Sequence, residues 1–188
     1  MVDKKCVLSK DDLNKALDNI SSCINLCDTK ASILLGFCAG IVAFCFSPDF
    51  LSMQKEIVLY FFHHSCFWSG IFISLHSLSV VVFVLGVIEL LMVVMPRIIL
   101  ESSEISQLKS ILFFGSIAKN TPAYEEYRKT VLETTDENLI FDDLLFQIHS
   151  TAIICDKKVY HQKAGLLSTS ISTIVFILTT LIGFVVVH

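Results

Sequence analysis

The sequence is poor in charge and in the residues that mark extended or disordered chains. Only 17% of its 188 residues are charged and 54% are hydrophobic, whereas soluble domains contain about 25% charged residues. It holds 3 Pro and 7 Gly beside 15 Phe, which excludes disordered, collagen-like and proline-rich classes. With a mean hydropathy of +0.70, the chain is expected to be a helical protein embedded in lipid rather than a soluble enzyme domain.

An excess of positive charge is also missing. Fourteen Lys and Arg residues stand against 18 Asp and Glu, so no cationic field favours nucleic acid as a partner. The seven Cys include no Cys-x-x-Cys pair, which predicts reduced packing residues rather than disulfides or a metal site. The first 30 residues lack the apolar core of a secretory signal, so we expect them to remain in the mature protein.

Three apolar stretches are long enough to cross a bilayer core, which needs about 20 apolar residues. They lie near residues 31–50, 70–95 and 164–188. Thirteen of the 14 basic residues precede the first stretch or separate the second from the third. The positive-inside rule therefore predicts a cytoplasmic N-terminus and a cytoplasmic segment 96–163. The aromatic-rich residues 57–68 are expected to lie at the outer membrane interface.

Apolar residues continue at helical spacing from the N-terminal segment into the first span. One helix of about 35 residues explains steps of three and four that run without a break, and Ser9 with Asp12 forms a capping box before it. These apolar positions are Leu13, Leu17, Ile20, Ile24, Cys27, Ala31, Leu34, Cys38, Ile41 and Cys45. The same spacing runs from Phe141 to Val159 into the third span.

Further local signals place the remaining helices. Thr134 and Glu137 form a second candidate capping box. Pro96 predicts a kink or break after the second span, followed by an amphipathic helix over residues 98–117, and Pro122 suits the first turn of a helix over residues 123–133. The sequence thus predicts an all-α membrane protein with three transmembrane helices, two of them extended into a cytoplasmic helical bundle. We expect a single domain over residues 1–188, with cytoplasmic helical parts near 9–30 and 96–163.

Charged residues gather where the spans are expected to meet the cytoplasm. Together they form an inner collar that can bind a nucleotide phosphate. They equally suit snorkelling anchors paired with one another and with lipid phosphates, and the residue types alone favour this second interpretation. The collar consists of Asp28, Lys30, Arg97, Asp156, Lys157 and Lys158.

Two titratable residues, His76 and Glu89, lie inside the second span. An isolated charge there costs about 2.5–3.5 kcal/mol on insertion scales. Glu89 is therefore expected to face a partner or water, either as a functional lining residue or as a structural pair with a neighbouring helix. For His76 the structural role is favoured.

Small and hydroxyl-bearing residues mark two helix faces. Ser32, Gly36 and Gly40 recur every four residues, which permits close approach of another helix, such as one from a neighbouring subunit. The third span is rich in Ser and Thr, and we expect these hydroxyls to bond between helices more than to line a pore. Catalytic motifs of the G-x-S-x-G, Walker, H-E-x-x-H and Rossmann types are missing, which predicts that the chain is not an enzyme.

Several of these segments match one family. They are Asn25–Gly36 at the start of the first span, Val94–Arg97 at the end of the second, Ile111–Gly115, and Asp143–Lys158 before the third. Over nearly its whole length the chain resembles the transmembrane effectors of Pycsar systems, a bacterial anti-phage defence in which a cyclase makes cyclic pyrimidine mononucleotides. The motif positions are held here by Asp28, Lys30, Ala31, Gly36, Pro96, Arg97 and Lys158.

The resemblance implies an inner-membrane protein that is silent until a nucleotide of the cUMP or cCMP class arrives. It then impairs the membrane and causes growth arrest or death. The chain has no room for a β-rich cyclic-nucleotide domain, so the ligand must bind the helical bundle, a subunit interface or a partner. We expect a homo-oligomer whose cytoplasmic helices adopt two packings, one of them favoured by the ligand or partner.

Two other functions remain open from the sequence. One is a constitutive oligomeric scaffold or anchor that recruits a soluble partner without altering membrane permeability. The other is a transporter with a proton path through Glu89 and His76, which would need several subunits to form a substrate cavity.

Overall fold

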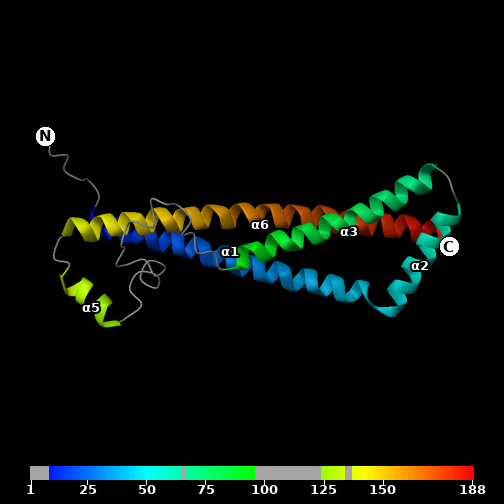
Figure 1. The fold of residues 1–188 in the computed structure, drawn as a ribbon. Helices are drawn as coiled ribbons and strands as arrows, with labels where there is room; N and C mark the ends of the chain where they lie inside the picture. Colours follow the sequence, from blue (N-terminus) through cyan, green and yellow to red (C-terminus); the bar gives the residue numbers. More distant parts are fainter. Residues whose placement is uncertain (1–8, 65–66, 96–123, 134–136) are drawn as a thin grey trace. The chain divides into compact units, whose positions relative to one another are not determined.

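The computed structural model describes residues 9–64, 67–95, 124–133 and 137–188, and all of its regular structure is α-helical (Figure 1). Three of the helices are long and apolar enough to cross a membrane. The prediction of an all-α protein with three membrane-spanning helices is therefore confirmed. The helices are α1 (Lys10–Cys45), α2 (Pro48–His63), α3 (Phe67–Val94), α5 (Tyr124–Glu133) and α6 (Glu137–Val187).

Helix α1 is a single element of 36 residues, as its unbroken apolar spacing predicts. It begins at the expected capping box, in which the Asp12 amide donates to Ser9 Oγ and the Ser9 amide donates to Asp12 Oδ2, both at 3.2 Å. The Ser9 hydroxyl also donates to Asp12 Oδ2, and these bonds hold the pKa of the exposed Asp12 below its ordinary value. Every predicted apolar position of α1 is buried or half-buried.

The chain breaks between α1 and α2 earlier than the hydropathy predicts. Helix α1 ends at Cys45, whereas the apolar stretch was expected to run to about residue 50. The reason is local: Ser47 takes an extended conformation as the N-cap residue and Pro48 occupies the first turn of α2. Proline suits that position because it has no amide hydrogen to leave unbonded and its φ is already helical. Residues 57–63, expected at the interface, belong to α2.

Some of the remaining predicted helices are present in the structure, and other predicted features lie outside the described residues. Helix α5 coincides with the predicted helix 123–133, and α6 continues for 51 residues through the predicted third span. Pro96, the helix expected over 98–117, Pro122 and the Thr134 capping box lie outside the described residues. The helices divide into two compact units. The first holds α1 up to Leu26, α5, and α6 up to Lys157; the second holds Cys27–Met95 and Lys158–His188.

The second unit is built on a close antiparallel pair, α3 and α6. Its contacts descend along α3 as they ascend along α6: Val93 with Lys158, Glu89 with His161, and His76 with Thr179. The two backbones approach at Gly86 and Gly165. A Cβ built on Gly86 would lie 2.9 Å from the Thr169 backbone nitrogen, and one on Gly165 would lie 3.0 Å from the Gly86 carbonyl oxygen. Glycine is therefore required at this crossing.

Helix α2 packs against the C-terminal part of α6. Ile57 is almost fully buried, and its side chain occupies the space that a Cβ on Gly183 would need. Gln54 Nε2 donates to Thr180 Oγ1 at 2.9 Å. Helix α2 thus lies beside the chain's C-terminus in the second unit (Figure 1).

The predicted small-residue face of α1 has open space beside it in the part of the chain that the structure describes. A Cβ built on Gly36 or Gly40 meets no other described atom within 4 Å, and Ser32 is exposed. The close approach that these residues were expected to permit occurs instead at Gly86 and Gly165. Whether the face of Ser32, Gly36 and Gly40 contacts another subunit stays a prediction.

Candidate functional site

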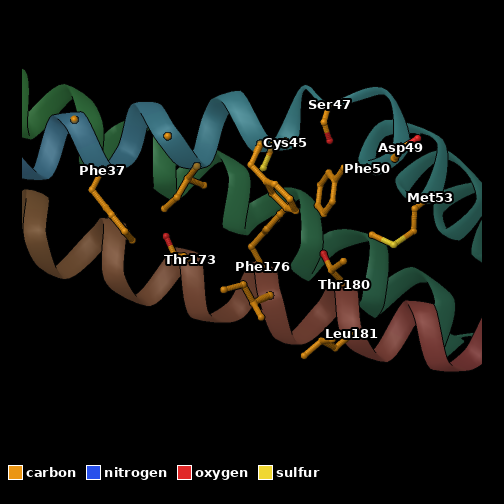
Figure 2. Close-up of a pocket in the computed structure, with 15 residues that line it drawn as sticks. Phe37, Cys45, Ser47, Asp49, Phe50, Met53, Thr173, Phe176, Thr180 and Leu181 are labelled. Atoms are coloured by element: carbon orange, nitrogen blue, oxygen red, sulfur yellow. The ribbon is translucent and has the colours of Figure 1, made fainter.

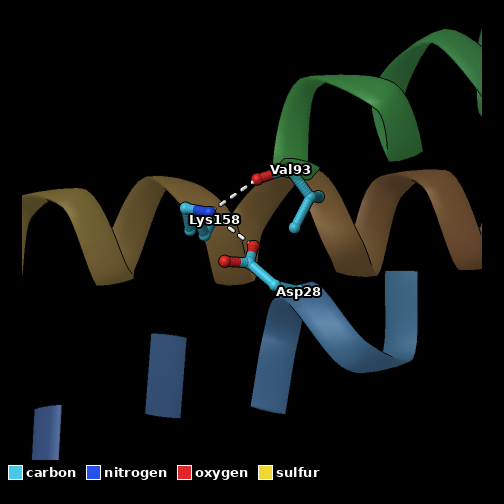
Figure 3. A network of polar contacts seen from close by, with 3 residues as sticks. All are labelled: Asp28, Val93 and Lys158. Carbon is cyan, nitrogen blue, oxygen red and sulfur yellow. Dashed lines mark hydrogen bonds and ion pairs between the residues drawn. The ribbon is translucent and has the colours of Figure 1, made fainter. Parts of the chain in front are cut away.

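The candidate site is the Lys158 junction, which we define as Lys158, Asp28 and the backbone carbonyl of Val93. It joins one residue from each of the three long helices, α6, α1 and α3 (Figure 3). Lys158 Nζ forms an ion pair with Asp28 Oδ1 and donates to the Val93 carbonyl at 2.8 Å. The sequence brings these groups together because Asp28 and Lys158 lie on the apolar-spaced faces of α1 and α6 that continue into the spans.

The junction satisfies the C-terminal end of α3. Val93 is the penultimate residue of that helix, where backbone carbonyls have no partner within the helix. The last turn of α3 contains no basic residue, so the cation that complements its negative dipole end comes from α6. Because a bare carbonyl in an apolar surrounding costs several kcal/mol, the Lys158 bond contributes to holding α3 in place.

Lys158 is the most deeply buried charge of the junction. Its side chain is 11% exposed, whereas the Asp28 side chain is 38% exposed. Burial of an ammonium requires a counterion and hydrogen-bond acceptors, and Asp28 and Val93 supply both. Asp28 therefore lies at the more accessible side of the junction. Water or another anion can reach its carboxylate more easily than it can reach the Lys158 ammonium.

A second polar contact lies one helical turn further along the α3–α6 pair. Glu89 Oε2 is 2.5 Å from His161 Nδ1. The structure thus gives Glu89 a neighbouring-helix partner, one of the two roles expected from the cost of an isolated charge in a span.

His76 has a different partner on α6. Its Nδ1 lies 2.9 Å from Thr179 Oγ1, and the Thr179 hydroxyl donates to its own helix at the Phe176 carbonyl. His76 must then donate to Thr179, which fixes its Nδ1–H tautomer. The α6 partners of His76 and Glu89 are about 27 Å apart along the helix, so the structure offers no direct proton transfer between these two residues.

The other collar residues are not part of the junction. Lys30, Asp156 and Lys157 are exposed, as water-facing or headgroup-facing anchors would be. Arg97 lies outside the described residues. Of the six collar positions, the structure therefore brings together Asp28 and Lys158. Within the described ranges, no group of three or more His, Cys, Asp or Glu side chains is placed to hold a metal ion.

The sequence also matches a known protein family. Residues 12–186 match the model of the Pycsar effector protein domain. The chain belongs to the Pycsar effector family. Searches of curated proteins and of solved structures returned no match. Family membership and three spanning helices indicate a multi-pass membrane effector of anti-phage defence whose helices contact lipid.

The effector also carries an apolar groove in its second unit, away from the junction. Its volume is about 900 Å³, and it lies between α1, α2 and α6 (Figure 2). Gly36, Gly40 and Phe44 line it from α1, Phe50 from α2, and Phe176 from α6. The groove therefore lies between α6 and the C-terminal part of α1, whereas Cys27 and Ala31, nearer the middle of α1, are buried.

The hydroxyl groups of the third span mostly bond their own helix. Thr169 donates to the Gly165 carbonyl at 2.8 Å, Ser172 to the Thr169 carbonyl at 3.0 Å, and Thr173 to the same carbonyl at 2.7 Å. Thr179 and Thr180 also accept from His76 and Gln54. Thr169, Ser172, Thr179 and Thr180 are buried, so in this effector they take part in packing within one chain.

Three features of the contacts between helices were not predicted from the sequence: His161, the Val93 carbonyl and the Gly86–Gly165 crossing. His161 lies three residues after Lys158, on the same side of α6, and this spacing was the available signal. Gly86 and Gly165 had no repeat to mark them. A backbone carbonyl carries no sequence signature at all, so its role emerged only from the structure.

Proposed function

We propose that this chain is the membrane effector of a Pycsar-type defence system. It responds to a cyclic pyrimidine mononucleotide of the cUMP or cCMP class by impairing the inner membrane of the bacterium, which arrests growth or kills the cell. The family match over residues 12–186 carries the proposal. The three apolar helices support it, because they supply the membrane contact that such an action needs.

The distribution of basic residues supports the orientation of the effector in the inner membrane. Thirteen of 14 precede α1's apolar part or lie between the second and third spans, and Lys and Arg are retained on the cytoplasmic side. We propose that the N-terminus and the α5 segment face the cytoplasm. The signal is then received on the side where a cyclase would make it.

The proposed action is a change of packing rather than a reaction. Three helices cannot enclose an aqueous channel by themselves, so permeation requires several copies of the chain. A ligand shifts the balance between a closed and an open packing only by its differential affinity for them. The exposed collar residues Lys30, Asp156 and Lys157 remain candidates for contact with the nucleotide phosphate.

The proposal is tested by producing the effector together with its signal in living cells. The chain is expressed with an inducible pyrimidine cyclase or with the same cyclase carrying an inactivated catalytic site. We expect entry of a membrane-impermeant dye and loss of membrane potential with the active cyclase and with neither control. Growth arrest without dye entry or depolarisation would support the scaffold function instead. Thermal-shift measurements with cUMP and cCMP on the purified chain then show whether the nucleotide binds it directly.

A further inference from the structure

We infer that the ion pair between Asp28 and Lys158 is an autoinhibitory contact that holds the effector in its resting state. It keeps α1 against the α3–α6 pair, and its loss allows α1 to move away. This inference rests on the proposed function, since it states how the same membrane activity is held off. An activating signal would act by breaking this ion pair.

The three long helices are packed against one another unequally. Helices α3 and α6 are in backbone contact at Gly86 and Gly165, where an added Cβ would lie within 3.0 Å of a neighbouring atom. Helix α1 has no such crossing within the described chain. Its Gly36 and Gly40 have open space where a Cβ would be, and a groove of about 900 Å³ lies beside them. Helix α1 is therefore the element that can separate from the other two.

Helix α1 is held to the other two helices close to Asp28. Its buried residues in the second unit are Cys27, Ala31 and Cys38, and the first two flank Asp28. In the described second unit, the ion pair of Asp28 with Lys158 is a polar link from α1 to the pair. That contact lies where α1 is packed most closely, so it restrains the inner end of α1.

The ion pair is more accessible from the Asp28 side than from the Lys158 side. Asp28 is 38% exposed and Lys158 is 11% exposed. When α1 withdraws, water replaces the ammonium around Asp28. Lys158 then loses its counterion, but withdrawal of α1 also uncovers the ammonium to water, and the Val93 carbonyl on α3, at 2.8 Å, remains its acceptor. The α3–α6 pair can therefore persist while α1 departs, as a two-state element requires.

The experiment removes the ion pair by two routes, of which Asp28→Asn leaves the bond from Lys158 to the Val93 carbonyl in place and Lys158→Met removes it as well. Asp28→Asn keeps the shape of the side chain and removes its charge, and Lys158→Met removes the ammonium. Asp18→Asn is the matched control, because Asp18 is an exposed carboxylate on the same helix. Each variant is measured in cells without any cyclase and in proteoliposomes of fixed protein content loaded with a fluorescent dye.

We expect Asp28→Asn and Lys158→Met to release dye without a cyclase, at least tenfold faster than the parent chain. Asp18→Asn should match the parent. The inference is overturned if both junction variants are silent without the cyclase and respond to it as the parent does. It is also overturned if Asp28→Asn cannot be activated at all.

The same data separate the failure of this inference from failure of the proposed function. If the parent chain never releases dye with an active cyclase, the proposed nucleotide response is wrong. Leakage from the junction variants would still establish the restraining contact in that case. Asp28→Glu keeps a carboxylate on α1 opposite Lys158 and is expected to leak less than Asp28→Asn.

Discussion

The backbone crossing of α3 and α6 should make alanine substitution at Gly86 more destabilising than alanine substitution at Gly36 or Gly40. Alanine at Gly86 would place its Cβ 2.8 Å from Thr169 Cγ2 and 2.9 Å from the Thr169 backbone nitrogen. A backbone atom cannot rotate away, so the helices must separate by roughly half an ångström. Such a gap forfeits a quarter or more of the dispersion attraction along the contact.

The magnitude follows from two opposing effects. Overpacking a tight contact costs about 1–3 kcal/mol, while replacing a helical glycine by alanine gains up to about 1 kcal/mol of helix propensity. Gly86→Ala is therefore expected to lower the free energy of unfolding in spite of the gain. Gly36→Ala and Gly40→Ala meet no described atom within 4 Å, so they should be neutral or slightly stabilising. The two kinds of variant should differ by about 1–3 kcal/mol.

The assay is unfolding of the purified chain in mixed micelles by increasing dodecyl sulfate, followed by circular dichroism. Monomeric conditions are used so that contacts between subunits do not contribute. If Gly86→Ala raises stability as much as Gly36→Ala does, the close approach of α3 and α6 does not exist. The reasoning from the Cβ distances would then fail with it.

Three further predictions concern polar groups. Glu89→Gln should retain a hydrogen bond to His161 and cost less stability than Glu89→Leu, by about 1–3 kcal/mol in micelle unfolding; equal losses would contradict the contact. Lys158→Met leaves the Val93 carbonyl and Asp28 without their cation and should lower stability by about 3 kcal/mol, whereas Lys157→Met, at an exposed position, should change it by less than about 0.5 kcal/mol. Because bonds from Ser9 lower the pKa of Asp12, the stabilisation of the first turn of α1 is complete above the ordinary pKa of 3.8 and is lost as the pH falls through the lower folded-state value. Hydrogen exchange of that turn should show this pH dependence, and Asp12→Asn should abolish it.

The helices and their inward faces could be predicted because they depend on local spacing. The run from Leu13 to Cys45 specifies α1 by its period alone, and Ser9 with Asp12 specifies its start. The sequence predicts the end of α1 too late because the stretch from Ala31 to Pro48 contains no charged residue. The Ser47–Pro48 step was the better signal, since capping geometry decides where a helix begins.

Pairings between helices could not be read from one sequence in the same way. The cost of an isolated carboxylate predicted that Glu89 needs a partner or water, but its partner His161 lies 72 positions later. Which of several polar residues meets it depends on the register of α3 against α6. That register is fixed by Gly86 and Gly165, which have no periodic signature. Gly36 and Gly40 have such a signature, yet a Cβ built on either meets no described atom within 4 Å.

The early end of α1 has a consequence for the surrounding lipid. From Ala31 to Cys45 the helix offers 15 charge-free residues, a hydrophobic length of about 22 Å against a hydrocarbon thickness of about 30 Å. On α6, Ala164–Val187 is charge-free and longer than that thickness. A span shorter than the hydrocarbon core is accommodated by thinning of the bilayer, by snorkelling of flanking residues or by association of subunits. The side of the protein formed by α1 therefore places the greatest demand on the surrounding bilayer, and lipids with longer tails increase the mismatch.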